Sequence, residues 1–169
     1  KGPLVGANWI TIGDAAGAIE ALTQLVACDA APGDARARLA KLLEQAGSFD
    51  DLAQRLLEWR APLPAGSPEA LRLDLRRAQI LRDRLDRRAE AACVEREILS
   101  QQRGSQEARD GLEASLRASG DLAGLAEHLA SRETYEADPQ VRAALAIERA
   151  ALFEQLPDGQ ERARLALEQ

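Results

Sequence analysis

The chain repeats itself, and this internal repeat constrains the fold more than any other feature of the sequence. When residues 34–60 are shifted by 73 positions onto residues 107–133, eight of the 27 positions are identical. Composition alone would give about three such matches. A shift of 72 extends the match from residues 73–91 to residues 145–163. The repeating unit is therefore about 72 residues long, which is the length of two helical hairpins.

Between the matched positions the sequence predicts helices. Ser67 followed by Pro68, and Asp138 followed by Pro139, are typical helix starts, and the apolar residues recur at steps of three and four. Hydrophobic residues make up 46% of the chain but aromatics only 3%, so the core must consist of leucine and alanine, which favour helices. The helices are expected at about 4–12, 14–28, 34–46, 49–61, 67–84, 87–103, 105–118, 121–133 and 138–155, with a further piece from 159 to the end.

The matched leucines are expected to form the core, because both copies of the repeat keep them. They are Leu39, Leu43, Leu52 and Leu56 in the first copy and Leu112, Leu116, Leu125 and Leu129 in the second.

The hairpins resemble the tetratricopeptide repeat family. Gly13, Ala18 and Leu22 lie at the family's spacings, and the units around Gly47 and Gly120 keep the turn glycine and the apolar residues after it. The resemblance implies an all-α fold, a right-handed α-solenoid of antiparallel hairpins with about nine to ten helices. It implies one repeat domain over residues 1–169, with hairpins at about 4–28, 34–61, 67–103, 105–133 and 138–169.

The family binds protein or peptide segments on the inner surface, built mainly from the first helix of each hairpin. The resemblance therefore implies a protein–protein interaction scaffold. Carried over position by position, it selects Lys41 and Glu44 from one hairpin, Arg82 from the next, and Asp110 and Arg117 from the repeat copy. The identity of the partner does not follow from the sequence.

An arginine cluster stands out in a chain whose net charge is −6. Seven arginines fall between Arg72 and Arg88, and Arg72, Arg76 and Arg77 lie on the helix side away from the leucines. One interpretation is a docking face for an acidic protein segment or a nucleic-acid backbone. The favoured interpretation is an exposed face paired with neighbouring acids. Nucleic acid is the weaker alternative, because no aromatic residues interleave with the arginines to stack on bases.

The sequence offers little that suggests catalysis, a metal or a cofactor, so an enzyme is not expected. His128 is the single histidine, and because Arg55 occupies the same place in the other repeat copy, we expect it on a solvated face. Cys28 and Cys93 share no motif and are expected to be small buried apolar groups. No apolar run is long enough to insert into a membrane, and a cytoplasmic location is favoured.

Two further expectations concern the chain as part of something larger. One alternative function is a regulatory or self-assembly segment that contacts its own flanking domains. The sequence also predicts a piece of a longer solenoid, with apolar residues at both ends that would support self-association, because terminal repeats normally carry a polar outer face.

Overall fold

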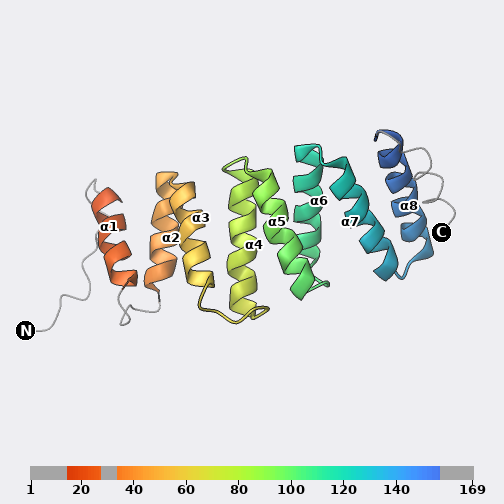
Figure 1. Ribbon diagram of the computed structural model, residues 1–169. Coiled ribbons are helices and arrows are strands. Elements are labelled where there is room, and N and C mark those ends of the chain that lie inside the picture. The colour runs from red at the N-terminus through yellow and green to blue at the C-terminus, as the bar shows by residue number, and fades with distance from the viewer. Residues whose placement is uncertain (1–14, 28–33, 157–169) are drawn as a thin grey trace, which may run out of the picture. The chain divides into compact units, whose positions relative to one another are not determined.

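The computed structural model describes residues 15–27 and 34–156, and within these ranges every regular element is a helix and no strand is present (Figure 1). Helices account for 81% of the described residues. The helices are α1 (Ala15–Val26), α2 (Ala35–Ala46), α3 (Phe49–Arg60), α4 (Pro68–Asp83), α5 (Arg88–Gln101), α6 (Gln106–Ser119), α7 (Leu122–Tyr135) and α8 (Pro139–Glu154). The all-α class is therefore confirmed. The helices expected at 4–12 and from 159 onward lie outside the described residues.

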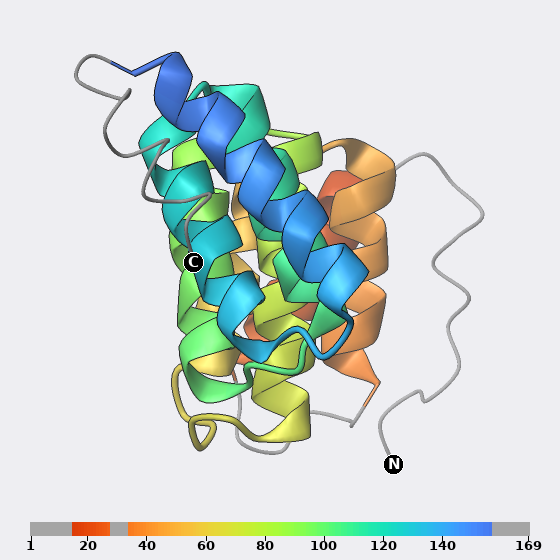
Figure 2. The same ribbon diagram turned by 90° about the vertical axis from the view of Figure 1, so that its right-hand side faces the viewer.

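The helices fall into two compact units, residues 1–58 and 59–169, with the boundary in the last turn of α3. In the first unit α1 packs against α2. In the second unit each helix from α4 to α8 packs against the next one in the chain (Figure 1). Figure 2 views this unit from its α8 end, with α8 in front of α7. Helix α4 also contacts α6, although α5 separates these two helices in the sequence.

The starts of the helices follow from the capping residues in the sequence. Ser67 accepts a hydrogen bond from the backbone N–H of Ala70, and Ser105 accepts one from Ala108, at 3.2 and 3.3 Å. Asp121 and Asp138 cap α7 and α8 in the same way. Each cap satisfies one of the backbone donors that a helix leaves without a partner in its first turn.

Two glycines end helices at equivalent places of the repeat. Gly47 follows α2 and Gly120 follows α6, each with φ of 72° in the left-handed region. The backbone N–H of the next residue, Ser48 or Asp121, donates to the carbonyl of Leu43 or Leu116 respectively. Glycine adopts this conformation without a Cβ clash. The hairpin at α4 and α5 has Asp86 in the turn instead, and it also lies at positive φ, at 55°.

The leucines selected from the repeat form the core, which confirms that prediction. Leu39, Leu43, Leu52, Leu56, Leu112, Leu116, Leu125 and Leu129 are all 3% exposed or less. In the second unit the last four of these residues join Leu145 and Leu152 of α8 in one apolar cluster. Packing of helix on helix through leucine and alanine therefore holds α6, α7 and α8 together.

Two expectations about single residues are wrong. His128 is buried, with 8% of its surface exposed, because α7 packs against both α6 and α8 and has little solvated surface left at this position. Cys93 is exposed instead of buried, because it lies on the side of α5 away from the buried Ala92 and Glu95. Cys28 lies outside the described residues.

Candidate binding groove between α4 and α6

Two adjoining open depressions lie in the second unit, and we call them together the α4–α6 groove. They have volumes of about 540 and 480 Å³ and share Arg82 of α4 and Ala114 of α6. The first is lined in addition by Gln106, Glu107, Asp110 and Gly111, and the second by Asp83, Arg84, Asp86, Arg88 and Ala118. Both depressions lie at α4 and α6, and the second also includes residues of the α4–α5 turn and Arg88 at the start of α5.

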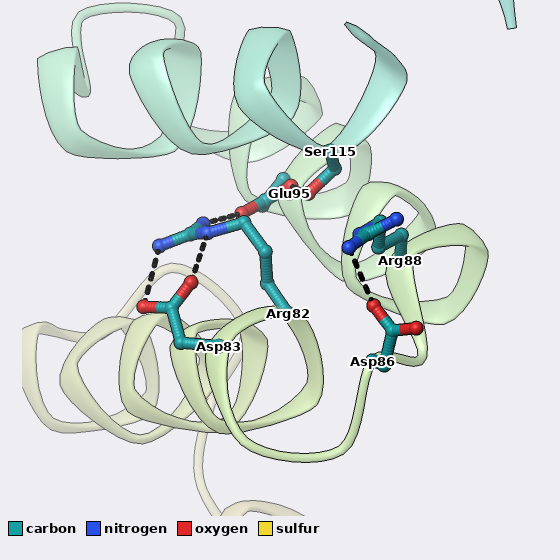
Figure 3. Close-up of polar contacts among 6 residues, drawn as sticks. All are labelled: Arg82, Asp83, Asp86, Arg88, Glu95 and Ser115. Atoms are coloured by element: carbon teal, nitrogen blue, oxygen red, sulfur yellow. Dashed lines mark hydrogen bonds and ion pairs between the residues drawn. The ribbon is translucent and has the colours of Figure 1, made fainter. Parts of the chain in front are cut away.

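A buried carboxylate lies beneath this groove. Glu95 of α5 is 1% exposed, which is rare for a glutamate. Its Oε2 accepts a hydrogen bond from Ser115 Oγ of α6 at 2.9 Å, and its Oε1 lies 2.6 Å from Nη1 of Arg82. Figure 3 shows Glu95 between these two partners, so one side chain links three helices. Burial raises the pKa of Glu95, and the bonds from Ser115 and Arg82 offset part of that rise.

The close approach of Arg82 and Glu95 depends on Gly111. A Cβ atom at this position would lie 2.3 Å from Glu95 Oε1 and 2.8 Å from Arg82 Nη1. Any other residue would therefore collide with the ion pair. Gly111 lines the α4–α6 groove and leaves room for the charged pair beneath it.

Arg82 also binds a second carboxylate. Its Nε lies 2.8 Å from Oδ1 of Asp83, whose side chain is 44% exposed (Figure 3). Arg88 pairs with Asp86 at 2.7 Å and donates to the backbone carbonyl of Ala118 at 3.1 Å. The guanidinium groups of Arg82 and Arg88 are therefore neutralised within the chain.

The acidic residues that line the groove from α6 differ in their ion pairing from Asp83 of α4, which pairs with Arg82. Glu107 and Asp110 are exposed and line the first depression. Asp110 accepts a hydrogen bond from the Gln106 amide at 2.7 Å, which brings no positive charge. Within the described residues neither Glu107 nor Asp110 forms an ion pair, so the negative charge at this end of the groove is not compensated.

The structure places the predicted binding residues in several different environments. Arg82 and Asp110 come together in the groove. Arg72 is exposed on α4, while Arg76 and Arg77 are partly buried there. Lys41 and Glu44 are exposed on α2, in the first unit.

Arg117 belongs to a second charged cluster, which links α6, α7 and α8. It donates to Glu113 of its own helix and to Glu148 of α8. Glu113 in turn pairs with Arg132 of α7 at 2.8 Å. These pairs hold neighbouring helices together, and they leave Arg117 engaged within the chain.

Sequence reasoning missed Glu95, Ser115 and Gly111. One signal was present, because Ser115 occupies the position of Leu42 when the two repeat copies are aligned. A polar residue at an apolar position of a repeat indicates a local change in the core. A second signal was present in α5, because Glu95 lies three or four residues from Ala91, Ala92 and Ile98 and therefore on the apolar face of this helix. Its partners could not be read from that pattern, since they come from the helices that precede and follow α5.

Two further observations concern the possible ligands and titratable groups of the described residues. They contain no cluster of three histidine, cysteine or acidic side chains that could hold a metal ion. His128 Nε2 is buried without a hydrogen-bond partner, and burial lowers the pKa of His128. No described helix combines the length and the apolar character that a bilayer crossing requires.

Comparisons with known proteins identify no relative of this chain: no family model matches it, and neither a curated protein nor a solved structure shows significant similarity.

Proposed function

We propose that this chain is a tetratricopeptide-like solenoid segment that binds a protein or peptide segment in the α4–α6 groove. The observation that carries the proposal is the groove itself. It lies between α4 and α6, and it includes Arg82 and Asp110, which the family resemblance assigns to an inner surface.

The repeat supports the solenoid part of the proposal. Helices α2 and α6 end on glycines with the same φ, and successive helices of the second unit pack in chain order. In repeat arrays each hairpin buries its apolar face against its neighbours, and the extended inner surface serves for binding.

The shape of the groove supports a peptide ligand over a small molecule. Small-molecule sites are concave and enclose most of the ligand. The α4–α6 groove is open, and its α6 wall includes the small residues Gly111, Ala114 and Ala118 beside Gln106, Glu107 and Asp110, so part of it leaves room for a chain backbone. An extended segment would lie along this wall and keep one side in solvent.

The pairing of the arginines argues for protein over nucleic acid. Nucleic-acid affinity depends on basic side chains that neutralise phosphates. Arg82 and Arg88 already pair with carboxylates of the chain, and Arg87 pairs with Glu90 at 2.6 Å. The hydrogen bond from Arg87 lowers the pKa of Glu90.

Selection from a displayed library of random peptides tests the proposal. The full chain is the bait, and selected peptides are measured against the variants Ala114→Arg and Ala123→Arg. Ala114 lies in the groove, whereas Ala123 is another exposed alanine, on α7 and outside the groove. We expect peptides that lose at least tenfold in affinity for Ala114→Arg and keep their affinity for Ala123→Arg. Peptides that bind both variants equally would place the binding surface elsewhere and contradict the proposal.

A further inference from the structure

The charge left uncompensated in the α4–α6 groove is negative. The groove-lining residues include three arginines and four acids, and the buried Glu95 adds a fifth acid directly beneath Arg82. Arg82 faces two carboxylates and Arg88 faces one. An acidic ligand would have to compete with these internal partners for each guanidinium.

The uncompensated acids are Glu107 and Asp110. They stand three residues apart on α6, which places both on one face of the helix. Both line the same depression, and Gly111 and Ala114 next to them carry no long side chain that could cover them. A cation that enters the groove therefore reaches both carboxylates at once.

Helix geometry offers a second explanation for Glu107 alone. It lies in the first turn of α6, where a negative side chain stabilises the helix dipole. Asp110 lies beyond the first turn, and the dipole effect falls off there. Stabilisation of the helix end therefore does not account for the second acid of the pair.

We propose that the α4–α6 groove binds a basic peptide segment, with a lysine or arginine side chain of the partner seated between Glu107 and Asp110. This inference rests on the proposed function and adds the chemistry of the partner. The partner is expected to carry small residues beside its basic side chain, because its backbone must lie against Gly111, Ala114 and Ala118. The arginine cluster on its own would suggest an acidic partner. We expect a basic partner instead, because Arg82 and Arg88 already pair with carboxylates of this chain.

The size of the effect follows from the exposure of the two acids. Solvent-exposed ion pairs contribute modestly, so each carboxylate should change affinity by about two- to fivefold. Electrostatic attraction also accelerates encounter, and this part falls with ionic strength. Removal of both acids should therefore weaken binding by about five- to twentyfold at low salt and by less at high salt.

The test compares two doubly neutralised variants of the full chain. Glu107→Gln/Asp110→Asn removes the groove acids. Glu69→Gln/Glu127→Gln is the matched control, because both residues are exposed acids outside the groove and Glu69 lies in the first turn of α4, as Glu107 does in α6. Affinity is measured by fluorescence anisotropy with labelled peptides from the library selection, at about 50 and 300 mM salt, and circular dichroism verifies that each variant is folded.

We expect the peptides that depend on Ala114 to be enriched in lysine or arginine. Their affinity should fall for Glu107→Gln/Asp110→Asn and stay unchanged for Glu69→Gln/Glu127→Gln. Peptides that lose affinity for Ala114→Arg but are acidic or neutral, or that bind the groove variant as well as the wild type, would overturn the basic-partner inference while peptide binding stands. If no selected peptide depends on Ala114, the proposed function fails and this inference fails with it.

Discussion

Glu95 and Arg82 form an ion pair of 2.6 Å in which the carboxylate is 1% exposed and the guanidinium side chain 22% exposed. Removal of one member of such a pair leaves a buried charge without compensation, which typically costs about 3–5 kcal/mol. We expect Arg82→Met to lower the free energy of unfolding by about 3 kcal/mol at pH 7, toward the lower end of that range because water reaches Arg82. Urea denaturation followed by circular dichroism provides the measurement.

The control for this prediction is the double variant Arg82→Met/Glu95→Gln. It removes both charges and keeps Ser115 as a partner for the amide, so it should be more stable than Arg82→Met alone. If both variants were equally destabilised, the loss would come from packing around Arg82, and the ion pair would have no part in it.

Gly111→Ala should destabilise the protein, although alanine normally favours a helix interior over glycine by about 1 kcal/mol. The new Cβ would lie 2.3 Å from Glu95 Oε1, and overpacking of this kind costs about 1–3 kcal/mol. Gly104→Ala, in the turn before α6, is the control for a glycine at which a Cβ meets no atom within 4 Å. A Gly111→Ala variant as stable as the wild type in urea would show that Glu95 and Arg82 can move apart without loss.

The pKa of Glu95 predicts a difference in pH dependence between the wild type and Glu95→Gln. Because burial raises the pKa of Glu95 in the folded state, the folded protein holds this proton more tightly than the unfolded chain. The contribution of Glu95 to the free energy of unfolding is therefore fully present when the pH is below the ordinary glutamate pKa of about 4.5. It is lost as the pH rises through the raised pKa of Glu95 in the folded state. Other carboxylates are the same in both proteins and cancel in the comparison.

We therefore expect Glu95→Gln to gain stability relative to the wild type as the pH rises from about 4 to 7. Free energies of unfolding at half-unit pH intervals provide the test. A difference that stays constant over this range, or that falls with pH, would mean that Glu95 ionises as an exposed glutamate does.

His128 has the opposite sign of pH dependence. Burial lowers its pKa, and Arg132, Arg109 and Arg96 lower it further, while Glu113 acts against them. The folded protein thus binds this proton less tightly than the unfolded chain. The contribution of His128 to the free energy of unfolding is therefore present when the pH is above the ordinary histidine pKa of about 6.5, and it is lost as the pH falls through the lowered pKa of the folded state. We expect His128→Leu to lose less stability than the wild type between pH 7 and 5, because leucine cannot be protonated and has no buried nitrogen without a partner.

The sequence predicts the helices and the core well, because both depend on local and periodic information. The repeat identifies the eight leucines, and the capping residues locate helix starts to within a residue or two. The apolar stripe of α5 includes the position of Glu95, but its partners Arg82 and Ser115 could not be predicted, since they lie 13 and 20 residues away on other helices. His128 was misplaced because the equivalent Arg55 suggests an exposed position, although burial depends on how neighbouring helices cover each copy.

The position of Gly111 bears on the conformational entropy of the partner binding proposed for the α4–α6 groove. An ion pair packed against a residue without a side chain fixes how closely α4 and α6 approach before any partner arrives. A preorganised surface of this kind loses little conformational entropy on association, so most of the ordering falls on the incoming chain. Partners that are already extended in solution would then have the advantage over those that must unfold to fit.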